Sequence, residues 1–339
     1  MFIASDIEAF KAIFINGLQN MLRSDDEGLG AFILVLANSM QDEKLYTLLS
    51  PTLNKIFAQL CSQTLIAPTD DNAVFSALKQ QGISELSDWQ TIKKTPWELV
   101  YNPLRALRPA RSSQQVIQNI QQAFNPQGFN FNKAFLKPEI LWEGVHQQRH
   151  LRVLYNKFPF APWHLLIVPE AEQQHPQFLS QTMHHYMMAL SIEYAQIFTG
   201  FGIGFNSLGA YASINQLHFQ AFIREAELPI ESAHWQHNGG DTLYPIHCTC
   251  CKNAHAAWQL ISSYHDTNQP YNLLYRANVC YVMPRQMQGT INLPDWAQGF
   301  AWLELCGVLT VSDLQSSTDL STALIETTLS TLQIKTKVL

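Results

Sequence analysis

The sequence predicts an α+β fold in which helices pack on a mixed, mainly antiparallel sheet, preceded by a helical N-terminal region. Two observations support this prediction. Apolar residues recur at helical spacing through the first 66 residues, whereas short runs rich in β-branched and aromatic residues prevail after residue 129. Only a few helical segments separate these runs, which is the pattern of an α+β protein rather than of a regularly alternating one.

Three apolar stripes predict helices within residues 1–66. They consist of Ile7, Phe10, Ile13, Phe14, Leu18 and Met21; then Phe32, Leu34, Val35 and Met40; then Leu53, Ile56, Phe57 and Leu60. Each stripe repeats every three to four residues, which places its members on one helix face. Asp25, Asp26 and Gly28 predict a break between the first two helices, and residues 68–72 are typical of a linker.

The rest of the chain alternates between strand and helix patterns. We expect strands at residues 97–101, 139–145, 151–155, 163–168 and 216–222, and a hairpin of 272–275 with 279–283. We expect helices at residues 176–198, 254–264 and 318–332, while residues 302–309 fit either a strand or a short helix. Together the patterns predict a helical region over 1–90, a domain over 91–312, and a C-terminal helix over 313–339 packed on that domain.

Composition narrows the class of protein. The chain of 339 residues is 47% hydrophobic and 14% charged, and its formal net charge of −6 argues against a nucleic-acid-binding surface. The apolar run 31–37 is too short to span a bilayer, so no membrane partner is expected. Asp6 and Glu8 are incompatible with an N-terminal signal sequence. Six cysteines over this length do not predict a disulfide framework, which favours a cytoplasmic location.

Residues 204–222 form the most informative segment of the chain. Its second half alternates: Leu217, Phe219 and Ala221 point to one side of a strand, and Gln216, His218, Gln220 and Phe222 point to the other. Its first half is a loop of small, donor-rich residues, which can turn backbone N–H groups toward an anion. Because a neutral histidine is a competent nucleophile, a histidine next to such a loop predicts attack on phosphorus.

The same segment resembles a signature of the histidine-triad superfamily. Its sequence is Gly-Phe-Asn-Ser-Leu-Gly-Ala-Tyr-Ala-Ser-Ile-Asn-Gln-Leu-His-Phe-Gln-Ala-Phe. The resemblance is to the GDP-L-galactose and GDP-D-glucose phosphorylases, within the branch of galactose-1-phosphate uridylyltransferases and diadenosine tetraphosphate phosphorylases. Weaker similarities extend it over roughly residues 95–310, including Phe129-Asn-Phe-Asn-Lys and the stretch from Asn156 to Pro169. The resemblance implies a histidine-triad-like sheet, in agreement with the α+β prediction.

The resemblance also implies a reaction and its participants. Similar proteins transfer a nucleoside monophosphate from a nucleotide sugar to inorganic phosphate through a nucleotidyl-histidine. Here the nucleophile would be His218, with Gln220 beside it; GDP-hexose and phosphate would be the substrates. His218 must then attack as a neutral imidazole whose other nitrogen is bonded to a fixed acceptor such as a backbone carbonyl. No cofactor is expected, and a homodimer is among the expected assemblies.

Further candidate contacts come from the same resemblance and from the loop chemistry. Candidates for nucleotide or phosphate binding are Asn206, Ser207, Gly209, Ser213, Asn215, Gln216, Asn156 and Lys133. His164 is equally compatible with packing and with substrate contact. Arg105, Arg108 and Arg111 follow the strand at 97–101 and either bind a substrate anion or form a solvated basic loop.

One position departs from the signature. The similar proteins carry histidine where this chain has Gln216. Glutamine is a poor zinc ligand, so the structural zinc seen with the equivalent histidine of some uridylyltransferases is not expected here. A separate cluster, Cys248, Cys250, Cys251 and His255, could bind zinc, but it lacks the usual spacing of paired ligands. Buried or loop thiols are the interpretation that we prefer.

Two other functions stay open. A dinucleoside polyphosphate phosphorylase or nucleotidyl hydrolase would use the same His218 and Gln220, and the Asn102-Pro-Leu-Arg stretch resembles a segment of diadenosine tetraphosphate phosphorylase-like proteins. A catalytically silent nucleotide-binding protein is the third hypothesis, motivated by Gln216. Phosphate dependence and the product formed would separate the first two, and binding without turnover would indicate the third.

Overall fold

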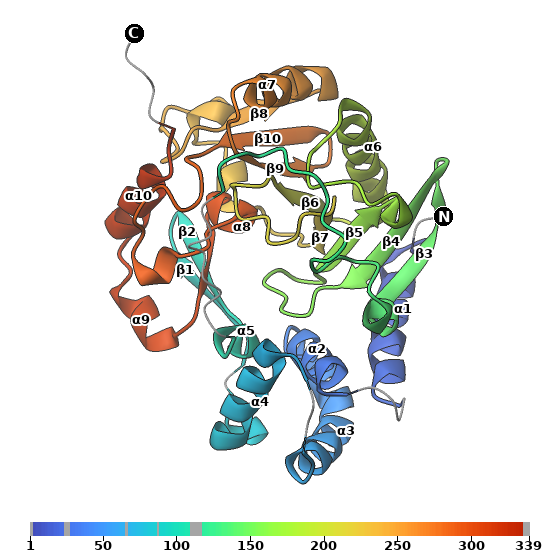
Figure 1. Cartoon of the computed structure of the whole chain (residues 1–339). Helices are drawn as coiled ribbons and strands as arrows, with labels where there is room; N and C mark the ends of the chain where they lie inside the picture. Colours follow the sequence, from blue (N-terminus) through green and yellow to red (C-terminus); the bar gives the residue numbers. More distant parts are fainter. Residues whose placement is uncertain (1–2, 24–27, 65–66, 87, 109–116, 335–339) are drawn as a thin grey trace.

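The computed structural model of the chain describes residues 3–23, 28–64, 67–86, 88–108 and 117–334, and within them it has the predicted α+β architecture (Figure 1). The larger of two sheets has eight strands in this described part, in the order β3-β4-β5-β7-β6-β9-β10-β8, and every neighbouring pair is antiparallel. Its strands are β3 (Ile140–His146), β4 (Arg149–Tyr155), β5 (Leu165–Pro169), β6 (Phe201–Asn206), β7 (Phe219–Ile223), β8 (Thr249–Cys251), β9 (Tyr271–Arg276) and β10 (Val279–Pro284).

The smaller sheet has the order β1-β2-β11. Its strands are β1 (Gln90–Lys94), β2 (Trp97–Tyr101) and β11 (Val308–Val311). β1 and β2 form an antiparallel hairpin. The chain returns to this hairpin after completing the large sheet, and β11 lies parallel to β2. The small sheet and α8 (Trp302–Leu305) share a hydrophobic cluster with Phe222, Leu274 and Tyr281 of the large sheet.

The opposite face of the large sheet carries the main core. α6 (Gln181–Ile197) and α7 (Ala254–Asp266) pack on this face, and both contribute to the cluster that holds Phe219 and Ala221. The alternation predicted for residues 216–222 is therefore confirmed: Leu217, Phe219 and Ala221 are buried in this cluster, whereas Phe222 belongs to the cluster on the other face. The strand itself begins at Phe219, so His218 and Gln216 lie in the extended approach to β7.

The predicted N-terminal helices are confirmed as α1 (Ile7–Met21), α2 (Leu29–Ser39) and α3 (Glu43–Cys61). The predicted break has Gly28 as the N-cap of α2, while Asp25 and Asp26 lie outside the described residues. α1 joins the core of the large sheet: the Phe14 ring lies 4.8 Å from that of Tyr155, whose hydroxyl donates to Phe14 O at 2.7 Å. The boundaries at residues 90 and 312 stay predictions.

Several element boundaries were predicted wrongly, and each has a local cause. Residues 68–72 are not a linker, because α4 (Thr69–Gln81) begins there with Asp70 and Asp71 in its first turn, where negative charge favours a helix. α6 begins later than predicted, since the Ser180 side chain caps it by accepting from Met183 N.

The C-terminal predictions need similar corrections. Residues 302–309, predicted as either a strand or a short helix, contain both: α8 ends at Leu305 and β11 begins at Val308. The helix predicted over 318–332 is two helices, α9 (Leu314–Asp319) and α10 (Thr322–Thr331), and Ser321 caps the second. Within the described part of the chain, no helix has both the length and the apolar character needed to cross a bilayer.

Candidate functional site

One end of the large sheet brings the predicted site residues together. Asn206 ends β6, Asn272 lies opposite it at the start of β9, and His218 directly precedes β7. Gln220 pairs with Gly204, two residues before Asn206, so Asn206 and Gln220 share one face of the sheet. The fold therefore places Asn206 of β6, and His218 and Gln220 at the start of β7, at the same end of the sheet.

His218 is buried and electrically neutral at ordinary pH. Its side chain is 5% exposed, and burial lowers the pKa of its imidazole to about 4, even though the hydrogen bond to the Gln216 carbonyl acts in the opposite direction. Nδ1 lies 2.7 Å from Gln216 O, an acceptor, so Nδ1 carries the proton and Nε2 keeps its lone pair. No described residue hydrogen-bonds Nε2. The imidazole thus has the tautomer and the backbone carbonyl that an attack by Nε2 needs.

Gln177 connects three predicted residues, and sequence reasoning missed it. Its Oε1 accepts from His218 N at 2.9 Å, and its Nε2 donates to Asn206 O at 2.8 Å and to His218 O at 3.2 Å. Its own N–H donates to Asn215 Oδ1 at 3.0 Å. Gln177 is 1% exposed and lies before α6 in a segment without a recognisable pattern, so only the tertiary structure reveals its role.

Gln220 and Asn206 are both fixed by the segment at the start of α8. Trp302 Nε1 donates to Gln220 Oε1 at 2.8 Å, and Trp302 N donates to Asn206 Oδ1 at 3.0 Å. Asn272 Nδ2 is a second donor to Asn206 Oδ1, at 2.6 Å. The indole can approach this closely because Gly204 has no side chain: a Cβ there would lie 2.3 Å from the Trp302 ring.

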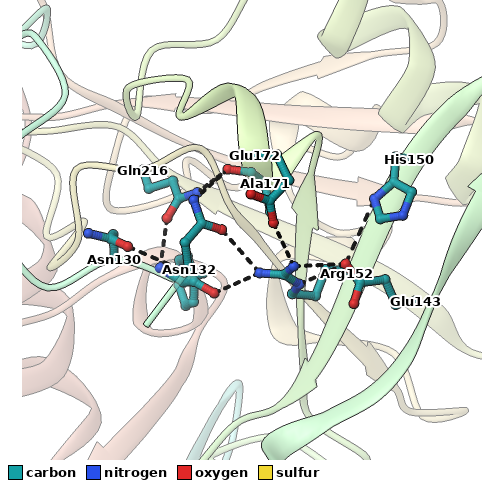
Figure 2. A network of polar contacts seen from close by, with 9 residues as sticks. Asn130, Asn132, Glu143, His150, Arg152, Ala171, Glu172 and Gln216 are labelled. Atoms are coloured by element: carbon teal, nitrogen blue, oxygen red, sulfur yellow. Dashed lines mark hydrogen bonds and ion pairs between the residues drawn. The ribbon is translucent and has the colours of Figure 1, made fainter. Parts of the chain in front are cut away.

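Gln216 belongs to the polar network in Figure 2, in which most of the contacts meet at Arg152. Its Oε1 accepts from Phe131 N at 2.7 Å and its Nε2 donates to Ala171 O at 3.0 Å. The Phe131 ring contacts the His218 imidazole, with 5.1 Å between ring centroids. Phe131 lies in the Phe129-Asn-Phe-Asn-Lys motif, so the sequence signal was present, but only Lys133 of that motif was selected as a candidate.

Three backbone N–H groups in the middle of the donor-rich loop after β6 are satisfied within the protein. Ala210 N and Ala212 N donate to Ser207 O, and Tyr211 N donates to Gln288 Oε1. The Ser207 hydroxyl accepts from Tyr271 N at 3.0 Å, and Gly209 adopts the left-handed conformation with a φ of 77°. These N–H groups therefore already have acceptors.

The other candidates differ in whether they hydrogen-bond to the residues around His218. Asn215 joins the Gln177 network, whereas Ser213 is exposed and Lys133 Nζ donates to Pro126 O at 3.4 Å. Asn156 Nδ2 lies 3.3 Å from His164 Nε2. Within the described residues, neither Ser213 nor Lys133 forms a hydrogen bond with His218.

The described arginine candidates lie in and just after α5 (Pro103–Ala106), and they pack against the segment that follows Asn156. The Arg105 guanidinium lies 4.7 Å from the centre of the Phe160 ring, and that of Arg108 lies 5.2 Å from the centre of the Phe158 ring. Burial lowers the pKa of His164 to about 3, and the Arg105 charge contributes to this shift. Arg111 lies outside the described residues.

The side chains of the cysteine cluster do not point to a common metal site. Cys250 and Cys251 are neighbours on β8 and face opposite cores. Burial raises the pKa of the Cys251 thiol to about 11 and also raises the pKa values of Cys248 and Cys250, which opposes the thiolate form that binds zinc. Among the residues that the structure describes, no three histidine, cysteine or carboxylate side chains form a group that could hold a metal ion.

Buried neutral histidines predict a specific pH dependence of stability. Burial lowers the pKa to about 3 for His164 and to about 4 for His184 and His218. Below about pH 6.5 the unfolded chain gains protons that the folded chain does not bind, so stability present above that pH is lost progressively down to about pH 4. The free energy of unfolding should fall by up to about 1.4 kcal/mol per pH unit for each such histidine.

Urea unfolding at pH 8, 6 and 5 measures this dependence. Replacing the buried His184 with glutamine should make the fall shallower, whereas the same replacement at the exposed His185 on the same helix should leave the slope unchanged. A free energy of unfolding that stays constant from pH 7 to pH 5 would contradict the assignment of these histidines as buried and neutral.

The fold and the site together define an α+β protein with a buried, neutral histidine at one end of its large sheet. Comparisons with known proteins are specific for one part of the chain. Residues 97–222 match the family model described as GDPGP1-like, N-terminal domain. This segment contains β2 to β7 and with them His218 and Gln220, so the resemblance to the GDP-sugar phosphorylases is confirmed there. Beyond residue 222 the resemblance stays a prediction.

Individual relatives agree with this assignment. The chain is 38% identical over 126 residues to GDP-D-glucose phosphorylase 1 of Danio rerio, which is 36% of this chain and 35% of that protein. It is 36% identical over 83 residues to GDP-L-galactose phosphorylase 2 of Arabidopsis thaliana, covering 24% and 18%. The chain thus matches about a third, or less, of the length of these relatives.

A solved structure extends the comparison of the fold. Yeast Ap4A phosphorylase Apa2 in complex with AMP superimposes with a TM-score of 0.51 at 14% sequence identity, over 81% of this chain and 100% of that chain. At this identity the likeness concerns the fold alone. It covers most of the chain, which agrees with the α+β class.

Proposed function

We propose that the chain is a nucleotide-sugar phosphorylase that converts GDP-hexose and inorganic phosphate into GDP and hexose 1-phosphate. The observation that carries the proposal is the state of His218: neutral, with Nδ1 bonded to Gln216 O and Nε2 without a partner among the described residues. The names of the relatives matched over residues 97–222 support the class of substrate.

The reaction follows from this state in two steps. The lone pair of His218 Nε2 forms a bond to the α-phosphorus, and the bond from that phosphorus to the bridging oxygen breaks. The leaving group is hexose 1-phosphate, a weak base that needs no strong general acid. An oxygen of inorganic phosphate then attacks the same phosphorus, the bond to Nε2 breaks, and GDP is released with His218 restored.

The remaining residues supply alignment and neutral hydrogen-bond donors. Gln220 is oriented by Trp302, which donates to its Oε1, and by a side-chain hydrogen bond with His164, and we assign its amide as a donor to a phosphoryl oxygen. Arg105, whose charge acts on His164 and whose guanidinium lies over the Phe160 ring, is the cation that we assign to the second phosphate. In this reaction no step needs a cofactor, and we further propose that the protein acts in the cytoplasm as a homodimer.

A second candidate is phosphorolysis of a dinucleoside polyphosphate. Asn102 caps α5 (Pro103–Ala106) by accepting from Leu104 N and Arg105 N, so the Asn-Pro-Leu-Arg stretch is a structured element that holds Arg105 at this site. The chemistry at His218 would be the same, and only the leaving group would differ.

A product assay separates the candidates. The purified chain is incubated with GDP-glucose, GDP-mannose, UDP-glucose or diadenosine tetraphosphate, each with and without phosphate, and products are resolved by ion-pair chromatography. We expect GDP and hexose 1-phosphate from a GDP-hexose only when phosphate is present. Turnover of diadenosine tetraphosphate alone would favour the second candidate, and nucleotide binding without turnover would indicate a silent binding protein.

A further inference from the structure

We propose that Gln216 is a positioning residue whose side-chain amide holds Phe131 against the His218 imidazole. The inference rests on the proposed function in one respect, namely that His218 is the nucleophile. It concerns the one position at which this chain departs from the signature, and it gives that position a physical role.

Both ends of the Gln216 amide are used. The side chain is 1% exposed; Oε1 accepts from Phe131 N at 2.7 Å, and Nε2 donates to Ala171 O at 3.0 Å. The main-chain oxygen of the same residue accepts from His218 Nδ1 at 2.7 Å. Gln216 therefore acts on the imidazole twice: directly at Nδ1, and through Phe131 at the ring face.

Phe131 is held on both sides of its backbone. Its N–H donates to Gln216, and its carbonyl accepts from Arg152 Nη1 at 2.9 Å. Arg152 is itself fixed by ion pairs to Glu143 at 2.8 Å and Glu172 at 3.0 Å. Because the main chain of Phe131 is bonded at both groups, its ring is presented to His218 in one orientation, tilted by 56° to the imidazole.

Glutamine satisfies this geometry because it carries one acceptor and donors on the same planar group. A neutral imidazole likewise offers one acceptor and one donor. Either side chain can therefore accept from Phe131 N and donate to Ala171 O. The presence of Gln216 in place of histidine is thus compatible with an intact site, and it does not by itself indicate a silent protein.

The consequence for reactivity is geometric. An imidazole that turns within a loosened pocket aligns poorly with phosphorus, and a misplacement of about 1 Å can cost about 100-fold in rate. Losing the clamp should lower kcat and leave the KM for the nucleotide sugar nearly unchanged, because neither Gln216 nor Phe131 is needed for its binding under this proposal.

Three variants and one control test the proposal. Gln216→Leu removes both hydrogen bonds, Gln216→Glu keeps the acceptor but loses the donor when ionised, and Gln216→His restores a donor and an acceptor. Gln59→Leu is the matched control, because Gln59 is exposed on α3 and far along the chain from the site. The expected kcat losses are about 100-fold for leucine and less than about fivefold for histidine, with no change for the control.

The glutamate variant adds a pH profile that a purely structural role would not produce. Burial raises the pKa of the introduced carboxyl group, and only its protonated form can donate to Ala171 O. Its kcat should therefore fall by about tenfold from pH 5 to pH 8 relative to the wild type. A ratio of the two rates that does not change with pH would overturn the role assigned to the donor.

Amide hydrogen exchange tests the clamp without substrate. The Phe131 amide should exchange at least about tenfold faster in Gln216→Leu and at nearly the wild-type rate in Gln216→His, while α6 peptides stay protected and so report an intact fold. Unchanged exchange at Phe131 in Gln216→Leu would overturn the clamp, as would faster exchange with an unaltered kcat. If the wild type turns over none of the donors, the proposed function fails, and the exchange result still decides whether the clamp exists.

Discussion

Replacing His218 with alanine should lower the rate of phosphorolysis by on the order of 10⁴-fold or more, because the covalent step then has no nucleophile. The loss should fall on kcat, since the imidazole forms its bond to phosphorus only as the reaction proceeds. The measurement is the rate of hexose 1-phosphate formation from GDP-glucose at saturating phosphate. Nε2 of His218 supplies the lone pair that attacks phosphorus, and the proposed reaction assigns this role to no other group.

The matched control is His185→Ala. His185 is exposed on α6 and forms no hydrogen bond with the described residues, so its loss should leave kcat within about twofold of the wild type. A His218→Ala variant that keeps its fold and more than about a tenth of the wild-type rate would require another nucleophile. Such a residual rate would contradict the two-step reaction through His218.

Replacing Gln177 with leucine should destabilise the protein by about 3 kcal/mol, the cost of leaving several buried backbone groups without partners. The glutamine side chain accepts from His218 N and donates to His218 O and Asn206 O. Leucine has a similar volume, so the cost reflects the lost hydrogen bonds rather than a cavity. Urea unfolding at pH 8 measures the change in the free energy of unfolding.

The same substitution at the exposed Gln59 provides the comparison and should change the free energy of unfolding by less than about 0.5 kcal/mol. Activity of Gln177→Leu should fall even under conditions where the variant is fully folded, because His218 loses the bonds that fix its backbone. Equal stability of the two variants would show that the hydrogen bonds of Gln177 to His218 and Asn206 do not stabilise this end of the sheet.

The fold class followed from patterns that are local in the sequence. Apolar residues at helical spacing predicted α1 to α3, and the hairpin of β9 and β10 followed from two short apolar runs around a turn at Ala277, whose φ is 50°. The errors occur where a single cap decides a boundary. Ser180 and Ser321 each begin a helix inside a stretch that has helical character on both sides.

The candidate site was predictable only in part. The resemblance and the alternation in residues 216–222 placed His218 and Gln220 on one face, and the predicted backbone acceptor is present as Gln216 O. Gln177 and Trp302 could not be found in this way, because they reach the site from segments about 40 and 80 residues away in the chain. No local pattern distinguishes them from other buried polar or aromatic residues.

The measurement that tests the central claim most directly is intact-protein mass spectrometry after incubation with GDP-glucose in the absence of phosphate. The two-step reaction predicts that the mass of one GMP is added to the chain, and that the addition disappears when phosphate is supplied or His218 is replaced with alanine. Rapid formation of GDP and hexose 1-phosphate with phosphate, but no adduct without it, would contradict a nucleotidyl-histidine and would point to direct attack by phosphate.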